Sequence, residues 1–274
     1  MKNLNLMLAL FITYFVGFSQ VSLEDRNALV ALNKATKGEN WIVQWDLNAP
    51  VNTWYGVRIE NNRVTQLELV NNNLSGTIPA ELATLSELKK LNLQQNRLIG
   101  TIPAELGNLN QLMVLNLSFN RLIGSIPETV YNLSKLEDLS LFMNDLTGTL
   151  SHGIGKLQNL KHLVLFNNNI SGNLPEEIGN LKMLETFQVS SNQITGSIPN
   201  ELCCLNKLQK ISLFDNKMEG RIPMSLALLT NLKELNLKEN RFESLYPDEL
   251  NQLSHIKQLH IDIKTSATNS LVGL

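Results

Sequence analysis

The sequence predicts an α/β solenoid, a curved stack of right-handed coils whose strands form a parallel β-sheet on the concave face. From Val64 to His255 the chain divides into eight blocks of 24 residues without an insertion or a deletion. Each block opens with apolar residues in the spacing LxxLxL, and an asparagine stands at its ninth position. Seven of the eight prolines stand at the sixteenth block position: Pro79, Pro103, Pro127, Pro175, Pro199, Pro223 and Pro247. A fixed period of this length indicates that each block is one structural unit stacked on the next.

The first 19 residues are typical of a secretory signal peptide. Lys2 supplies a positive charge, residues 6–16 form an apolar run, and Gly17-Phe18-Ser19 offers small residues around a cleavage site. A run of 11 apolar residues is too short to span a bilayer, which disfavours an uncleaved anchor. We expect the mature chain to begin near Gln20, without a transmembrane segment, and to be secreted or displayed on the extracellular surface, or in the periplasm if the source is bacterial.

The charge of the chain disfavours two classes of partner. The net charge is −2, and no block of like charge occurs. Nucleic acids and anionic membranes attract basic patches, so we expect neither as a partner.

Each block begins with a short strand and continues into an asparagine. Alternation in LxxLxL points the leucines to one side, as in a strand with one buried face. A carboxamide both donates and accepts hydrogen bonds, so we expect this asparagine to bond the backbone of its own turn and of the following coil. The predicted asparagine ladder consists of Asn72, Asn96, Asn120, Asn144, Asn168, Asn192, Asn216 and Asn240.

The second half of each block predicts a turn and a return segment. A glycine at the thirteenth position, such as Gly172, suits a tight turn with positive φ. The Ile-Pro pair then favours an extended corner, and the apolar spacing xxLxxL brings the chain back across the convex side. The fourth block has Ser151 in place of proline, which we interpret as local variation or a widened bend. A ninth strand, starting at Ile256, follows the eighth block.

The block pattern LxxLxLxxNxLxGxIPxxLxxLxx resembles the plant-type leucine-rich repeat, and the resemblance covers residues 64–263. It implies an N-terminal cap over residues 28–69, with a helix, tryptophans and the segment Trp54 to Val57. Ser22 and Asp25 suit the start of that helix. Plant receptor caps carry paired cysteines beside this segment, whereas Thr53 and Ile59 flank it here, as in disulfide-free bacterial secreted relatives. The domain prediction is a signal peptide over 1–19, the N-terminal cap over 20–63, eight repeats over 64–255, and a final strand and tail over 256–274.

Aromatic residues mark the predicted concave face as a binding surface. Four of the six phenylalanines after residue 19 occupy its outward positions, and aromatic residues gathered on one surface usually serve recognition. A purely structural role for these phenylalanines, as a cover for neighbouring strands, is the alternative. The candidate binding residues are Val114, Phe119, Asp138, Ser140, Phe142, Met143, His162, Val164, Phe166, Asn167, Gln188, Lys210 and Phe214.

Catalysis and metal binding are disfavoured. Asp138, Ser140 and His162 lie on neighbouring predicted strands, but a flat sheet face offers no oxyanion hole or pocket that excludes water. The four histidines have no ligand spacing, so we expect no metal and no cofactor.

The sequence therefore predicts a secreted, receptor-like binding module rather than an enzyme. Its expected partner is a protein or a cell-surface or glycan ligand on the concave face. Two alternatives stay open: an inhibitor of an extracellular polysaccharide-degrading enzyme, as small secreted plant members of the resembled family are, and a structural or adhesive surface protein.

Overall fold

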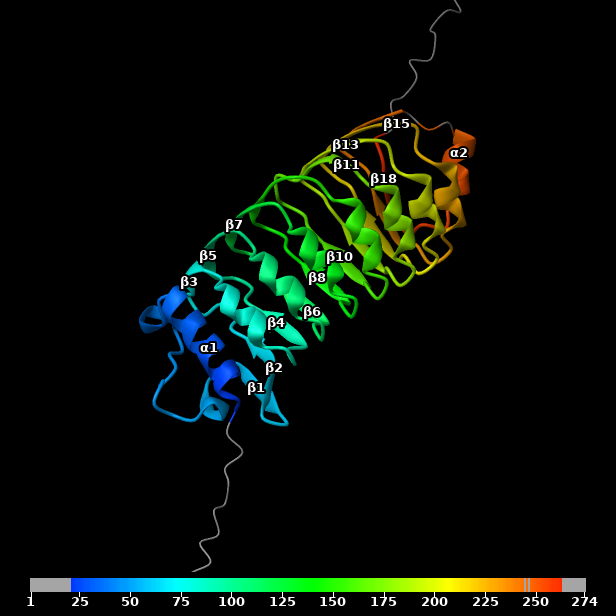
Figure 1. The fold of residues 1–274 in the computed structure, drawn as a ribbon. Helices are drawn as coiled ribbons and strands as arrows, with labels where there is room; N and C mark the ends of the chain where they lie inside the picture. Colours follow the sequence, from blue (N-terminus) through cyan, green and yellow to red (C-terminus); the bar gives the residue numbers. More distant parts are fainter. Residues whose placement is uncertain (1–20, 244, 246, 263–274) are drawn as a thin grey trace, which may run out of the picture.

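The computed structural model shows a long stack of coils with a helix at each end (Figure 1). It describes residues 21–243, 245 and 247–262. The predicted signal peptide therefore lies outside the described residues, as does most of the predicted tail. Within the described part, leucine and isoleucine side chains fill one continuous core that runs from the first coil to the last.

The N-terminal cap begins with helix α1 (Leu23–Ala35). Its N-cap is Ser22, whose side-chain oxygen accepts a hydrogen bond from the backbone N–H of Asp25 at 3.1 Å, as the sequence predicts. Two 3-10 helices follow, η1 (Gly38–Asn40) and η2 (Val51–Thr53). The cap buries three tryptophans in contact with one another, with ring centroids 4.8 Å apart in both neighbouring pairs: Trp41, Trp45 and Trp54. Aromatic packing among these rings thus helps to hold the cap together.

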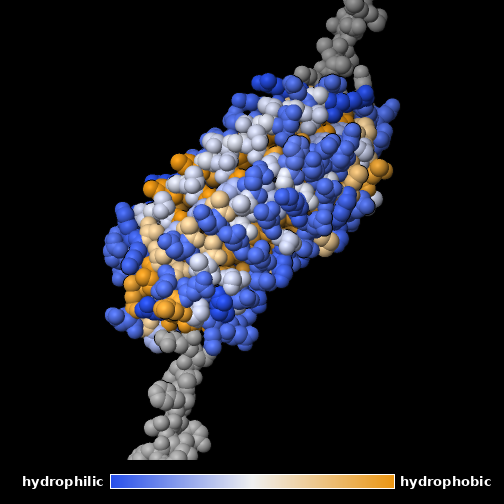
Figure 2. All heavy atoms as spheres, in the orientation of Figure 1, coloured by the Kyte–Doolittle hydropathy of each residue, from blue (hydrophilic) through white to orange (hydrophobic). Residues whose placement is uncertain are grey.

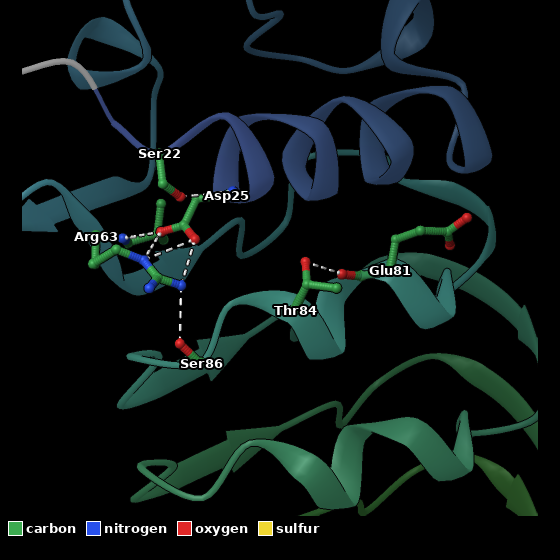
Figure 3. Close-up of polar contacts among 7 residues, drawn as sticks. Ser22, Asp25, Arg63, Glu81, Thr84 and Ser86 are labelled. Carbon is green, nitrogen blue, oxygen red and sulfur yellow. Dashed lines mark hydrogen bonds and ion pairs between the residues drawn. The ribbon is translucent and has the colours of Figure 1, made fainter.

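A buried carboxylate joins the cap to the first repeat (Figure 3). Asp25 is fully buried and accepts hydrogen bonds from Nε of Arg63 at 3.1 Å and from the backbone N–H of Val64 at 2.7 Å. Arg63 also donates to the hydroxyl of Ser86 in the first repeat. The hydrogen bond to Asp25 raises the pKa of Arg63, which keeps the guanidinium charged.

The largest sheet has ten strands, in the order β1-β2-β4-β6-β8-β10-β12-β14-β16-β18. β1 (Val57–Glu60) pairs antiparallel with β2. The strands from β2 onward are parallel, and equivalent residues of successive blocks pair with each other, for example Leu67 with Leu91. These parallel strands are β2 (Arg63–Glu68), β4 (Lys90–Asn92), β6 (Val114–Asn116), β8 (Asp138–Ser140), β10 (His162–Val164), β12 (Thr186–Gln188), β14 (Lys210–Ser212), β16 (Glu234–Asn236) and β18 (Gln258–His260). The predicted parallel sheet is confirmed, and the antiparallel β1 is an addition that the repeat could not predict.

The return segments are short 3-10 helices that follow the proline, or Ser151 in the fourth block. They are η3 (Ala80–Thr84), η4 (Ala104–Asn108), η5 (Glu128–Asn132), η6 (His152–Lys156), η7 (Glu176–Asn180), η8 (Asn200–Cys204) and η9 (Met224–Leu228). In the eighth block the α-helix α2 (Pro247–Gln252) takes this place. The spacing xxLxxL suits these helices because residues three apart lie on one side of a 3-10 helix.

Between the large sheet and the 3-10 helices, the predicted turn is instead a second set of strands. They form two four-stranded sheets, β3-β5-β7-β9 and β11-β13-β15-β17. The strands are β3 (Ser75–Thr77), β5 (Arg97–Gly100), β7 (Arg121–Gly124), β9 (Asp145–Leu146), β11 (Ser171–Asn173), β13 (Gln193–Gly196), β15 (Lys217–Gly220) and β17 (Arg241–Phe242). The block glycines do have positive φ, between 72° at Gly196 and 140° at Gly76. These strands are too short for an alternation of apolar and polar residues to predict them from the sequence.

The fourth block departs from the repeat because of a tyrosine in the third. Tyr131 stands where neighbouring blocks have glycine or alanine, and its side chain is fully buried. A Cβ atom on Gly153 would lie 2.9 Å from Cδ2 of Tyr131, so the fourth block needs a glycine there. Ser151 replaces the proline beside it and caps η6 by accepting from the N–H of Gly153. Only one isolated bridge, between Thr149 and Ser171, connects the two four-stranded sheets in this part of the described chain.

The asparagine ladder bonds the backbone in a constant pattern. In the fifth block, Nδ2 of Asn168 donates to Leu165 O of its own coil at 2.9 Å and to Leu141 O of the preceding coil at 3.1 Å. Its Oδ1 accepts from the N–H of Leu146 in the preceding coil at 3.0 Å. The expectation of a bond to the following coil is wrong for the side chain, because the backbone N–H of Asn168 makes that bond, to Ser191 O. Asn72, which begins the ladder, bonds the cap at Val43 instead.

Candidate functional site: the outward face of the large sheet

Three phenylalanine rings form a contact ladder on the outward face of the ten-stranded sheet, which we call the sheet face. The ring centroids of Phe142 and Phe166 lie 4.4 Å apart in a stacked arrangement with an interplanar angle of 19°. Phe119 contacts Phe142 edge to face, at 5.3 Å and 79°. Phe119 is 40% exposed and Met143 beside it 36% exposed, whereas Phe142 and Phe166 are half-buried. The three rings, here the phenylalanine ladder, span the third to fifth repeats.

The backbone turns sharply beside this ladder. The eighth residue of each block has a left-handed φ between 49° and 58°: Asn71, Gln95, Phe119, Met143, Asn167, Ser191, Asp215 and Glu239. A residue with a side chain adopts this conformation only when the surrounding structure holds it there. From the second repeat onward the asparagine ladder does so, since each carboxamide there also donates to the carbonyl two residues before it, as Asn120 does to Ser118 O at 3.2 Å. The side chains of Phe119, Met143 and Asn167 therefore stand on a fixed backbone.

Polar side chains on neighbouring strands border the phenylalanine ladder. The hydroxyl of Ser140 donates to Oδ1 of Asp138 at 2.6 Å, and Asp138 pairs in register with Val114 on one side and His162 on the other. Among the described residues no hydrogen bond joins His162 to Ser140, so the hydroxyl lacks the base that would activate a nucleophile. The arrangement can present a carboxylate and an imidazole to a ligand.

A shallow hollow opens on the C-terminal half of the same face. It is lined by His162, Glu185, Thr186, Gln209, Lys210, Lys233, Glu234, Lys257 and Gln258. Nζ of Lys210 lies 2.8 Å from Oε2 of Glu234, and Nζ of Lys161 lies 2.7 Å from Oε2 of Glu137. The hydrogen bond to Glu137 raises the pKa of Lys161, which keeps this amine protonated. Both pairs are partly exposed, so each stabilises the fold only slightly.

The remaining predicted residues do not join one cluster. Val164 and Gln188 lie on β10 and β12, directly beside each other. Phe214 is separated from the phenylalanine ladder by the sixth repeat, where Ser190 takes the phenylalanine position and bonds Ser212 at 2.6 Å. The structure thus gathers Phe119, Phe142, Met143 and Phe166, and leaves Phe214 apart.

The second position of each block was missing from the sequence-based site. Five of the eight blocks carry a charged side chain there: Lys89, Glu137, Lys161, Glu185 and Lys233. Lys161 pairs with Glu137 of the preceding coil, and Glu185 and Lys233 line the hollow. A comparison of the second position between blocks would show the opposite charges in the sequence. It would not show that these side chains are accessible at the edge of the sheet.

The part of the chain that the structure describes contains neither a cluster of metal ligands nor a membrane-spanning helix. No group of three or more His, Cys, Asp or Glu side chains there could hold a metal ion. No helix of residues 21–262, outside the two undescribed positions, is long and apolar enough to cross a membrane. The adjacent Cys203 and Cys204 are both free thiols, one buried and one exposed.

Known proteins resemble the chain along the repeats. A family described as "Leucine-rich repeat region" matches residues 143–273, and two further leucine-rich-repeat families match residues 86–146 and 63–85. Polygalacturonase inhibitor 1 of Arabidopsis thaliana is 30% identical over 90 residues, which are 31% of this chain and 27% of that protein. The receptor-like kinase TMK4 of the same plant is 33% identical over 86 residues, 31% of this chain and only 9% of the kinase. The chain therefore spans a small part of the curated relatives that it matches.

Solved structures extend the likeness over most of the described chain. The ectodomain of the Arabidopsis thaliana receptor kinase GASSHO1/SCHENGEN3, in complex with Casparian strip integrity factor 2, superposes with a TM-score of 0.74 at 30% identity, covering 85% of this chain and 32% of that one. A plant ice-binding protein superposes with a TM-score of 0.77 at 25% identity, covering 89% of this chain and 79% of that one. Together with the repeats, the parallel sheet and the asparagine ladder, these matches show that the chain belongs to the plant-type leucine-rich-repeat family.

Proposed function

We propose that the chain is a secreted binding module that holds a protein partner on its sheet face, centred on the phenylalanine ladder. The observation that supports this proposal is the contact between Phe119, Phe142 and Phe166, which leaves aromatic surface exposed on a fixed backbone. Rigid aromatic side chains are the residues that most often dominate the energy of protein interfaces.

The geometry of the rings favours a protein over a glycan. Sugars commonly pack on the open face of an aromatic ring, but Phe142 and Phe166 stack on each other and Phe119 packs edge to face with Phe142. The free ring edges and the thioether of Met143 suit an apolar side chain of a partner. The carboxylate of Asp138 and the imidazole of His162 would border such a contact.

The relatives support a protein partner of one of two kinds. The GASSHO1/SCHENGEN3 ectodomain is in complex with an integrity factor, and the inhibitor relative is named for the polygalacturonase that it inhibits. For this chain, a secreted ligand-binding role is the first proposal, and inhibition of a polysaccharide-degrading enzyme is a special case of it. Secretion itself is proposed from the predicted signal peptide over residues 1–19.

A capture experiment tests the sheet face. The protein from Gln20 onward is immobilised beside Phe142→Glu/Phe166→Glu and, as a matched control, Phe214→Glu, which changes the same block position outside the ladder. We expect the wild type and the control to capture one protein from extracellular extracts, and the double variant to lose it, because one hot-spot residue is worth about 2 kcal/mol or more, roughly thirtyfold in affinity. Equal capture by all three proteins would exclude the ladder and favour a structural or adhesive role.

Ice binding is a second candidate function. The match to the plant ice-binding protein covers 89% of this chain and 79% of that protein. The first six repeats also carry an uncharged face outside the sheet face. A difference between the melting and freezing temperatures of a solution of this protein, with a matched albumin solution as the control, would support this function; equal temperatures would exclude it.

A further inference from the structure

The strands β3 to β13 present a second surface, which we call the flank face. It consists of the twelfth and fourteenth block positions in the first six repeats, within residues 75–77, 99–101, 123–125, 147–149, 171–173 and 195–197. These positions hold threonine, serine, isoleucine and one asparagine, without a charged residue. The face ends at the seventh repeat, where Glu219 and Arg221 occupy the same positions. Figure 2 shows this edge of the molecule as a pale band with apolar patches between hydrophilic surfaces.

The flank face repeats at a fixed interval. The fourteenth residue of one coil pairs with the twelfth residue of the next, as Thr77 does with Ile99, and Thr149 with Ser171. Paired strands lie about 4.8 Å apart, and residues two apart on one strand lie about 7 Å apart. Ile99 and Ile123 are 48% and 51% exposed, so apolar groups stand beside hydroxyl groups in the second and third repeats.

Close packing on the block glycines fixes the array. A Cβ atom on Gly124 would lie 2.9 Å from Cγ2 of Thr101, and one on Gly172 would lie 2.7 Å from Cγ2 of Thr149. Each threonine methyl group therefore rests over the glycine of the following coil, which restricts its χ1 rotamer. The hydroxyl groups of Thr101 and Thr149 make no hydrogen bond to any described residue in this structure, so they are available to an external partner.

The flank face lacks the features of a protein interface. Six strands at this spacing give a band about 25 Å long, and one about 10 Å wide covers roughly 250 Å², well below the roughly 800 Å² per partner of a stable protein complex. Its own twelfth and fourteenth positions hold no tryptophan, tyrosine or arginine. Exposed charged residues border it on the same strands, where Arg97, Arg121 and Asp145 pair beside Ser75, Ile99 and Ile123. A surface of this kind gains affinity only from a partner that repeats as it does.

From this geometry we propose that the flank face binds ice. This inference rests on the second candidate function and assigns it a surface. Ice presents water oxygens at a fixed repeat close to the spacing of the strands, so many hydroxyl groups can bond the lattice at once. The exposed methyl and isoleucine groups release ordered water when they meet the solid. Because the side chains are already fixed, little conformational entropy is lost on binding.

The test compares substitutions on and off the flank face in the protein from Gln20 onward. Thr101→Lys/Thr149→Lys places two charged, flexible side chains in the array. The matched control, Ser134→Lys/Thr230→Lys, makes the same change at exposed positions after η5 and η9. Each protein is measured for the gap between melting and freezing temperature and for its partition into a growing ice hemisphere, and circular dichroism checks that the fold is kept.

We expect the wild type and the control variant to shape ice and enter it, and the flank variant to lose both properties. Equal activity of the two variants, or loss of activity in both, would overturn the assignment to the flank face while leaving ice binding by the wild type intact. A wild type without any effect on ice would instead remove the second candidate function itself. The folded Phe142→Glu/Phe166→Glu variant should retain wild-type ice activity, and its loss there would place the ice site on the sheet face.

Discussion

The ninth and the seventh position of a block lie only two residues apart, yet they behave in opposite ways. The ninth is asparagine in all eight repeats, and its carboxamide bonds backbone groups of its own and the preceding coil, as in Asn168. The seventh changes from valine to glutamine, serine, phenylalanine and lysine along the stack. Where a side chain bonds the coil itself, it must recur; where it faces outward, it is free to differ.

The sheet face and the flank face extend this contrast to binding. The residues of the sheet face differ from repeat to repeat: the phenylalanine ladder occurs in three repeats and ends where Ser190 replaces the aromatic residue. The flank face keeps one character through six repeats. A surface that differs between repeats suits one specific partner, and a surface that recurs suits a periodic partner. Measurements of stability can test whether residues that bond the coil are more constrained than residues that face outward.

The largest effect on stability is expected at the asparagine ladder. Asn168→Ala leaves the buried Leu146 N–H without its partner, whereas Leu141 C=O still accepts from Nδ2 of Asn144 at 3.0 Å. We therefore expect the free energy of unfolding in urea to fall by about 1–3 kcal/mol, the cost of one unpaired buried group. Asn169→Ala is the matched control, because that exposed side chain makes no hydrogen bond to the described residues. A similar loss in both variants would show that the ladder is no more constrained than its neighbours.

The recurring residues made the solenoid predictable from the sequence. The strands, the asparagine ladder and the positive φ of the block glycines all rest on positions that repeat. The antiparallel β1 and the burial of Asp25 against Arg63 could not be predicted, because each occurs once and depends on contacts across the cap. The period of the repeat thus predicts the large sheet and the asparagine ladder, but neither the short second set of strands nor the ends of the stack.

The candidate site was predictable only in part, for the same reason. The sequence placed Phe119, Phe142 and Phe166 on one face, but their contact depends on ring rotation and on the left-handed backbone at Phe119. Phe214 is a candidate of the same face but an outlier in the seventh repeat, and Ser190 in the sixth repeat separates it from the ladder. Distances between side chains on adjacent coils come from packing, which a list of positions does not contain.

A smaller effect is expected at Tyr131, the one large residue in a position of small ones. Burial raises the pKa of its hydroxyl to about 12, and the backbone N–H of Ser151 only partly offsets this. The hydroxyl forms no hydrogen bond of good geometry within the described residues. Tyr131→Phe should therefore leave the free energy of unfolding within about 0.5 kcal/mol of wild type, or raise it slightly, since no partner is lost. Because the pKa is raised in the folded state, stability is fully present below the ordinary value near 10 and falls as the pH rises toward 12. A urea series at pH 7 and pH 11 on both proteins checks this; a clear loss for Tyr131→Phe at pH 7 would reveal a hydrogen bond that the structure does not contain.

The smallest effect is expected from an exposed pair beside this irregular block. Nδ1 of His152 lies 2.7 Å from Oε2 of Glu177 in the next coil. This hydrogen bond raises the pKa of His152 and lowers that of Glu177. The ion pair therefore stabilises the folded state most at pH values between the two pKa values. This stabilisation is lost as the pH rises through the raised pKa of His152, and as the pH falls through the lowered pKa of Glu177. In an NMR titration, Glu177→Gln should return the pKa of His152 toward its ordinary value without a measurable change in the unfolding midpoint, because an exposed ion pair adds little to stability. An unchanged His152 titration would mean that His152 and Glu177 do not pair. Exposed residues of successive repeats on the convex side would then vary independently of one another, as those on the sheet face do.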